Sequence, residues 1–191
     1  LLRDSEATRA SALAAIRRAA AAARPGGVLV IYLQAHGLKL DGVTRLALYD
    51  YSATRPVETG LGMPDLARVL IESWRGGSLI LVGDFCYSGA LAQVVQKVSA
   101  AGKGPAAAIC SAVASDRATS RWSFLDALVA GLSGNSDVDE DGNNTVTFRE
   151  LSNWIIGAMV YGEDQMAEVT MAGGFSSQLA LARVSEYTRH P

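Results

Sequence analysis

The sequence predicts a mixed α/β fold with a mostly parallel sheet, and three apolar runs of strand length carry this prediction. The runs are residues 28–33, 78–83 and 106–112. Each is apolar at most consecutive positions, which is typical of strands that are covered on both faces of a sheet. Stretches with helical periodicity lie between the runs, and this alternation indicates a three-layer α/β/α sandwich.

In the first half of the chain, turn residues separate the predicted elements. The expected order is a helix from Asp4 or Ser5 to about Ala23, a strand at 28–33, a short strand at 45–49, a loop at 51–62 and a helix from Met63 to Trp74. Pro25 ends the first helix, because proline cannot continue one, whereas Pro64 suits the first turn of the second. The inner stripe of the second helix is Leu66, Val69, Leu70 and Trp74.

The second half continues the alternation. The expected order is a strand at 78–83, a helix from Ala90, a loop at 100–105, a strand at 106–112, a helix at 120–132, an acidic loop at 133–145, a helix at 148–161 and a last strand at 177–182. The helix at 120–132 is expected to face inward through Phe124, Leu125, Leu128 and Leu132. No internal repeat or low-complexity linker is visible, so residues 1–191 are predicted to form one domain.

Composition indicates a globular protein. The 191 residues are 49% hydrophobic and 19% charged, far from the composition of disordered chains. A net charge of −2 argues against nucleic acid as a partner, because phosphate binding favours a basic surface. No apolar run reaches the ~18 residues that span a bilayer, so no membrane partner is expected. Cys86 and Cys110 lie on different predicted strands, which argues against a disulfide framework and predicts a cytoplasmic protein.

A cysteine and a histidine lie at the ends of two predicted strands. Cys86 follows the strand at 78–83 and precedes a helix, and His36 ends the apolar stretch that begins at Gly27. The carboxyl ends of parallel strands meet at one edge of a sheet, so the two side chains are expected to lie close together. Either residue alone is more often structural, but a thiol with a base beside it is a nucleophile. The sequence therefore predicts a Cys86–His36 dyad, with the N–H groups of Gly37 and Cys86 as an oxyanion hole.

The residues around this pair resemble the caspase-type cysteine peptidases, and among them the metacaspases and prokaryotic caspase homologues. In that family the histidine block usually reads Ser-Gly-His-Gly and the cysteine block Asp-Ser-Cys-His-Ser-Gly. Here the corresponding stretches are His36-Gly37 and Asp84-Phe-Cys-Tyr-Ser-Gly. His36 and Cys86 are 50 residues apart, a separation similar to that in caspases.

Some residues depart from the family's blocks, and others extend the resemblance. The departures are Gln34, Ala35, Phe85 and Tyr87. Similarity outside the blocks lies in residues 4–16, 111–132 and 139–151. The resemblance covers most of the chain and implies a caspase-like fold whose first strand would precede residue 1.

The resemblance also implies a substrate. Metacaspases carry an acid two residues before the nucleophile and cleave after Arg or Lys, and Asp84 holds this place. A carboxylate pairs well with a guanidinium, so Asp84 is expected to bind the side chain of the P1 residue, which precedes the cut bond. Asp50 and Asp116 are further acids that could complete this S1 pocket, and Ser111 is expected to line it. The alternative is that Asp84 only caps a helix or holds a loop.

The function that follows is a cysteine endopeptidase in regulated proteolysis, with a protein or peptide substrate and activation by another protease or a regulator. Relatives in bacteria act in stress and defence-linked cell death, which is implied by resemblance alone. Two alternatives stay open at this point. One is a catalytically inactive caspase-like interaction scaffold, and the other is a Cys–His amidase of different specificity.

The acidic loop can be laid on the EF-hand calcium-binding pattern. Asp139, Asp141, Asn143 and Glu150 take positions 1, 3, 5 and 12, and Asn144 stands where glycine is usual. Oxygen ligands at this spacing suit Ca²⁺. The alternative is a solvated turn before a helix, since Thr147 and Glu150 also form a capping box. No cofactor is expected to be required for catalysis, and the resemblance does not tie any Ca²⁺ dependence to this loop.

Overall fold

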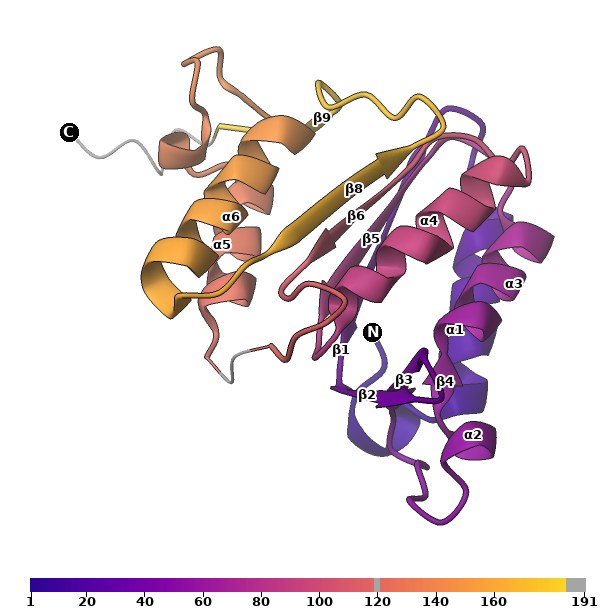
Figure 1. The fold of residues 1–191 in the computed structure, drawn as a ribbon. Coiled ribbons are helices and arrows are strands. Elements are labelled where there is room, and N and C mark those ends of the chain that lie inside the picture. The colour runs from indigo at the N-terminus through magenta and orange to yellow at the C-terminus, as the bar shows by residue number, and fades with distance from the viewer. Residues whose placement is uncertain (119–120, 185–191) are drawn as a thin grey trace. The chain divides into compact units, whose positions relative to one another are not determined.

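A computed structural model describes residues 1–118 and 121–184, which form two compact units (Figure 1). The sheet unit comprises Leu1–Ala118 and Glu168–Phe175. The helix-pair unit comprises the described residues among 119–167 and 176–191. That the whole chain forms one domain stays a prediction. Within the described residues, every helix is too short or too polar to cross a bilayer.

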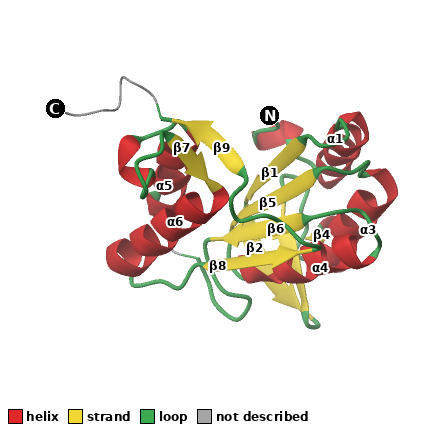
Figure 2. Cartoon of the chain, turned by 90° about the horizontal axis from the view of Figure 1, so that it is seen from above, coloured by secondary structure: helices red, strands yellow, loops and turns green. Residues whose placement is uncertain are grey.

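The sheet unit is built on a four-stranded sheet in the order β1-β5-β6-β8 (Figure 2). Its strands are β1 (Val28–Gln34), β5 (Ser78–Asp84), β6 (Ala106–Cys110) and β8 (Glu168–Ala172). The first three are mutually parallel, and β8 is antiparallel to β6. The predicted class is confirmed: a mixed α/β fold with a mostly parallel central sheet, compatible with a three-layer α/β/α arrangement.

Three helices of the sheet unit form a core with one face of this sheet (Figure 1). They are α1 (Arg9–Ala22), α3 (Met63–Ser73) and α4 (Leu91–Ala100), and a short 3-10 turn (Ser88–Ala90) leads into α4. The predicted stripe of α3 is confirmed, since Leu66, Leu70 and Trp74 are almost fully buried. Burying each such side chain stabilises the fold by about 2 kcal/mol.

A second, small sheet is antiparallel and joins β2 (His36–Leu40), β3 (Val43–Ala47) and β4 (Leu61–Gly62). The strand predicted at 45–49 is therefore shifted, and its partner β2 was not predicted. A two-residue turn with positive φ at Asp41 and Gly42 connects them, as tight hairpins require. The loop predicted at 51–62 contains β4 and the short helix α2 (Pro56–Thr59).

Two other expectations about the sheet unit are wrong, and one strand of it was missed. The first helix begins at Arg9 with Thr8 as its cap, because Thr8 and Ser11 form a capping box and Asp4–Glu6 is a separate 3-10 turn. The strand β1 is not covered on both faces, since Val28 and Val30 are 44% and 43% exposed at the edge of the sheet. The strand β8 was not predicted.

The helix-pair unit packs α5 (Ser123–Leu132) against α6 (Phe148–Glu163). A small antiparallel pair, β7 (Thr145–Thr147) and β9 (Ala180–Arg183), and a 3-10 turn (Ser136–Val138) complete it. Ser120, the predicted first residue of the earlier helix, lies outside the described residues. Phe124 and Leu128 are buried as predicted, whereas Leu132 at the helix end is 40% exposed.

Candidate active site

The structure brings the histidine and cysteine segments into direct backbone contact. A Cβ atom added at Gly37 would lie 2.0 Å from the carbonyl oxygen of Cys86, 2.9 Å from its carbonyl carbon and 3.0 Å from its nitrogen. Real Cβ atoms do not come this close to other atoms, so only glycine allows the two segments to meet here. The contact places His36, the residue before Gly37, next to the Cys86 segment.

The sheet register explains how residues so far apart in sequence meet. Gln34 of β1 pairs with Asp84 of the parallel strand β5. His36 follows Gln34 by two residues and Cys86 follows Asp84 by two residues, so both come at the same edge of the sheet. His36 was expected to end β1, but β1 ends at Gln34 and His36 opens β2. The reason is that the chain bends at Ala35 and leaves the parallel sheet for the antiparallel one. His36 is exposed and Cys86 is half-buried.

The turn after Cys86 is held by hydrogen bonds to the segment after β6. Tyr87 has a left-handed backbone (φ 66°), which is uncommon for a large side chain and frequent at functional sites. The buried Ser88 hydroxyl donates to the Ala112 carbonyl at 3.1 Å and accepts from the Ala112 N–H at 3.0 Å. Gly89 N–H donates to the same carbonyl at 2.8 Å. The sequence did not predict this role of Ser88, because its partner Ala112 lies 24 residues further along the chain.

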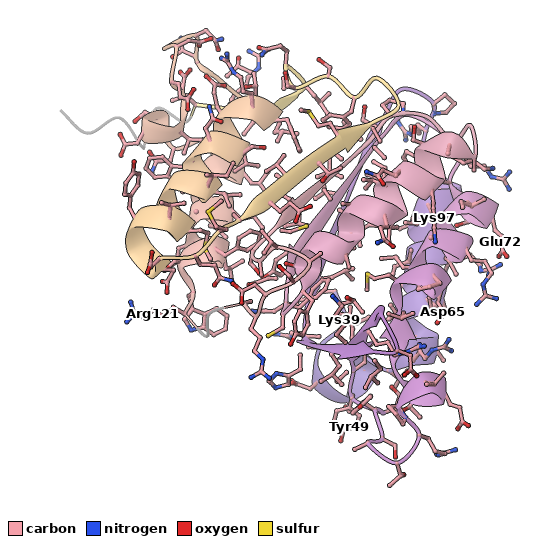
Figure 3. The ribbon with its side chains drawn as sticks, in the orientation of Figure 1. Lys39, Tyr49, Asp65, Glu72, Lys97 and Arg121 are labelled. Atoms are coloured by element: carbon pink, nitrogen blue, oxygen red, sulfur yellow. The ribbon has the colours of Figure 1, made fainter. Side chains whose placement is uncertain are left out.

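An arginine from the loop after β6 lies beside the same turn. Tyr87 N–H donates to the Asp116 carbonyl at 2.7 Å, and Arg117 Nε donates to the Tyr87 hydroxyl at 3.4 Å. These contacts with Tyr87, and then the proximity of Cys86, raise the pKa of Arg117. On the β2 side, Lys39 Nζ donates to the Ala114 carbonyl of this loop at 3.4 Å (Figure 3).

The predicted S1 acid, Asp84, is half-buried at the end of β5 and accepts a hydrogen bond from Tyr32. The Tyr32 hydroxyl donates to Asp84 Oδ2 at 3.0 Å. Burial raises the pKa of the Asp84 carboxyl, and the hydroxyls of Tyr32 and Ser111 only partly offset this effect. Ser111 is itself buried, and its hydroxyl lies close enough to Asp84 to lower the pKa of the carboxyl, although Oγ forms no well-aligned hydrogen bond with a described residue. The structure brings Asp84, Ser111 and Tyr32 together, and their role as an S1 pocket stays a prediction.

The raised pKa of Asp84 predicts a stability effect of definite sign. The folded protein holds this proton to a higher pH than the unfolded chain does, so ionising Asp84 costs stability as pH rises from about 4 upward. We expect the melting temperature of Asp84→Asn minus that of wild type to increase by a few degrees as pH rises from 4 to 7.5. Differential scanning calorimetry across this range checks it. A difference that is constant with pH would show that the carboxyl is not perturbed.

The other two acids proposed for S1 have local structural contacts. Asp50 Oδ1 accepts the Arg9 N–H at 2.8 Å, at the start of α1. Asp116 Oδ1 accepts the N–H of its neighbour Arg117 at 2.8 Å. In the described part of the chain, no hydrogen bond or ion pair joins either carboxylate to Asp84. A part for Asp50 or Asp116 in the pocket therefore stays a prediction without a supporting contact.

The second cysteine offers a natural comparison with the first. Cys110 ends β6 and is 1% exposed, inside the core as predicted. Burial, and after it the Glu168 carboxylate, raises the pKa of its thiol. A protonated, buried thiol is a poor nucleophile. Of the two free cysteines, Cys86 is thus the one that a reagent in solvent can reach.

The acidic loop brings three of its four predicted ligands together. Asp139, Asp141 and Glu150 offer carboxylate oxygens that all lie within 4.8 Å of one another, a spacing that suits one Ca²⁺ with ligands at about 2.4 Å. The fourth, Asn143, donates its N–H to the carboxylates of Asp139 and Asp141, at 3.1 Å each. Asn144 has φ 66°, as its place in the pattern requires.

The competing interpretation of this loop also has support. Thr147 and Glu150 form the predicted capping box at the start of α6. Both oxygens of the buried Glu150 carboxylate already accept hydrogen bonds, Oε2 from Thr147 and Oε1 from the Glu140 N–H. The loop is therefore ordered by its own bonds, and the carboxylate geometry alone does not distinguish a cation site from a capped turn.

A titration separates these two interpretations. If the loop binds Ca²⁺, calorimetry with millimolar Ca²⁺ will give a saturable heat that Asp139→Asn removes, because position 1 supplies a direct ligand. Asp126→Asn is the matched control, since Asp126 is an exposed carboxylate on α5. A wild-type titration without heat would assign the loop to capping alone.

Comparisons with known proteins add a fold likeness. No family model matches the chain, and no curated protein sequence does. Among solved structures, the protein GSU0716 from Geobacter sulfurreducens is similar, with a TM-score of 0.67 at 18% identity over 95% of this chain and 80% of that one. At this identity the likeness shows the fold alone, and the family resemblance stated from the sequence stays a prediction.

Proposed function

We propose that this chain is a caspase-type cysteine endopeptidase that cleaves proteins after arginine or lysine. The observation that carries the proposal is the contact of Gly37 with the Cys86 peptide, which sets a histidine segment against a half-exposed cysteine. A Cys–His pair on neighbouring segments is the arrangement that activates a thiol. Cys86 is half-buried and Cys110 is fully buried, the difference expected between a nucleophile and a core residue.

The proposed reaction follows the chemistry of a thiol and an imidazole. His36 takes the proton of the Cys86 thiol, and the sulfur attacks the carbonyl carbon of the peptide bond. Backbone N–H groups of Gly37 and Cys86 stabilise the resulting oxyanion, and each such donor is worth about 3 kcal/mol. His36 then protonates the leaving amine, which leaves an acyl thioester on Cys86. Water, deprotonated by His36, hydrolyses this thioester and restores the thiol.

The selectivity of the proposed enzyme rests on Asp84. Its carboxylate lies two residues before the nucleophile and is partly withdrawn from water, where pairing with a cation is stronger than on the surface. Two free cysteines suit a reducing compartment, and we place the protein in the cytoplasm, with protein or peptide substrates and a protease or regulator as activator.

One assay tests the proposal. We expect turnover of a fluorogenic peptide with arginine at P1, with or without Ca²⁺, that disappears in Cys86→Ala and survives in Cys110→Ala. The second variant controls for the loss of a cysteine. If no Cys86-dependent turnover is found under any activating condition, the chain is an interaction scaffold. Cleavage of small amides but not of peptides would make it an amidase of other specificity.

A further inference from the structure

We infer that Tyr32 is a positioning residue for the basic side chain of the substrate, acting through its hydrogen bond to Asp84. As far as turnover is concerned, this inference rests on the proposed function. The two residues lie on adjacent parallel strands, β1 and β5, and their oxygens are 3.0 Å apart. No feature of the sequence pointed to Tyr32, because the contact depends on the sheet register.

The phenol is the donor in this bond. Burial, and then the charge of Asp84 and the hydrogen bond to it, raises the pKa of Tyr32, so its hydroxyl stays protonated through the neutral range. The proton fixes one oxygen of the Asp84 carboxylate, Oδ2, and leaves Oδ1 for a second partner. A carboxylate held in one rotamer loses less entropy when it binds a cation.

Tyr32 and Asp84 lie at the end of a sheet face that is mostly apolar. Side chains alternate along a strand, so Val28 and Val30 share the Tyr32 side of β1, and Ile80 and Val82 share the Asp84 side of β5. Between Ser78 at one end and the polar group of Tyr32, Gln34 and Asp84 at the other, this face is apolar on both strands.

The other polar group at this point is Ser111, which follows β6. Its buried hydroxyl lowers the pKa of Asp84, although it forms no well-aligned hydrogen bond with a described residue. The nearby titratable groups of β6 and β8 do not contribute to the pKa shift of Asp84. Cys110 belongs to the core on the opposite face of the sheet, and Glu168 pairs with Cys110 in register. Tyr32 and Ser111 are therefore the neighbours that set the state of Asp84.

The inference predicts a specific kinetic signature for Tyr32→Phe. Without the hydroxyl, the carboxylate is free to rotate and its pKa rises further, since the Tyr32 bond is one of the contacts that lower it. For peptides with arginine at P1 we expect KM to rise about tenfold with kcat nearly unchanged. The acid limb of the pH profile of kcat/KM should also move to higher pH. A merely structural role would not shift that limb.

Tyr49→Phe is the matched control, because Tyr49 is 66% exposed (Figure 3) and lies outside the proposed machinery. An acid limb at the same pH in Tyr32→Phe and wild type would overturn the inference. So would an equal rise in KM for a peptide with neutral citrulline at P1, because the effect would then not concern the charge.

A second measurement keeps the inference testable if the protein is not a peptidase. Binding of benzamidine, a small guanidinium-like cation, can be followed by calorimetry in Cys86→Ala, which cannot turn over substrate. We expect Tyr32→Phe in this background to weaken binding about tenfold near neutral pH, and by a smaller factor as pH rises and the Asp84 carboxyl ionises in both proteins. Benzamidine binding without any peptide turnover would reject the proposed function and keep the cation site. Equal affinity with and without the Tyr32 hydroxyl would reject the inference itself.

Discussion

Replacing Gly37 with alanine is expected to abolish Cys86-dependent turnover almost completely. The new methyl group would be placed 2.0 Å from the Cys86 carbonyl oxygen, so the two segments must separate. The atoms in the way are backbone, which cannot rotate aside as a flexible side chain can. Because displacements of about 1 Å can cost 100-fold in rate, we expect kcat/KM for an arginine-P1 peptide to fall at least about 100-fold. Steady-state kinetics measure this directly.

The control for that experiment is Gly157→Ala. Gly157 lies inside α6 with an ordinary backbone and with nothing within 4 Å of an added Cβ. Alanine at such a position is neutral or stabilises a helix by up to about 1 kcal/mol. Circular dichroism of both variants separates a local effect from unfolding. A folded Gly37→Ala protein with wild-type turnover would show that the Gly37–Cys86 contact has no part in catalysis.

Asp84→Ala is expected to remove the preference for basic P1 residues while leaving the nucleophile intact. Truncating one partner of a partly buried charge pair typically costs 2–5 kcal/mol, which corresponds to a fall of about 30-fold to 5,000-fold in kcat/KM for arginine-P1 peptides. Alkylation of Cys86 by iodoacetamide should proceed at the wild-type rate, since Asp84 is not part of the dyad. Peptide kinetics and mass spectrometry measure the two effects separately.

Asp50→Ala and Asp116→Ala serve as comparisons in the same assay. Each carboxylate accepts a hydrogen bond from a main-chain N–H, and within the described residues neither makes a hydrogen bond or ion pair with Asp84, so we expect either variant to keep arginine selectivity. Retained cleavage after arginine in Asp84→Ala, or its loss in Asp50→Ala or Asp116→Ala, would assign the S1 pocket to another acid.

Long, strongly patterned elements could be predicted from the sequence, and short ones could not. The bounds of β5 and α3 were predicted nearly to the residue. The strand β5 is apolar at successive positions, and α3 has Pro64 in its first turn and a regular apolar stripe. In the hairpin, β2 was missed and β3 was shifted, since these strands of five residues mix lysine, arginine and glycine with apolar residues. For such strands, register and pairing decide the structure, and a single sequence does not contain them.

The same distinction applies to the candidate site. Cys86, His36 and Gly37 could be found from motif and spacing, and the structure brings their segments together. Ser88 and Tyr32 could not, because each acts through a partner that lies far away in sequence: Ala112 for Ser88 and Asp84 for Tyr32. Such residues appear only when neighbouring strands are placed in register.

The central claim is that Cys86 is a nucleophile activated by His36 and directed to basic substrates. The most direct test is intact-protein mass spectrometry after reaction with an arginine acyloxymethyl ketone, in which the thiolate displaces a carboxylate leaving group and forms a thioether. The account predicts a single adduct on Cys86, slowed at least about 100-fold in His36→Ala, and none on the buried Cys110. No adduct on Cys86, or labelling at the same rate without His36, would contradict it.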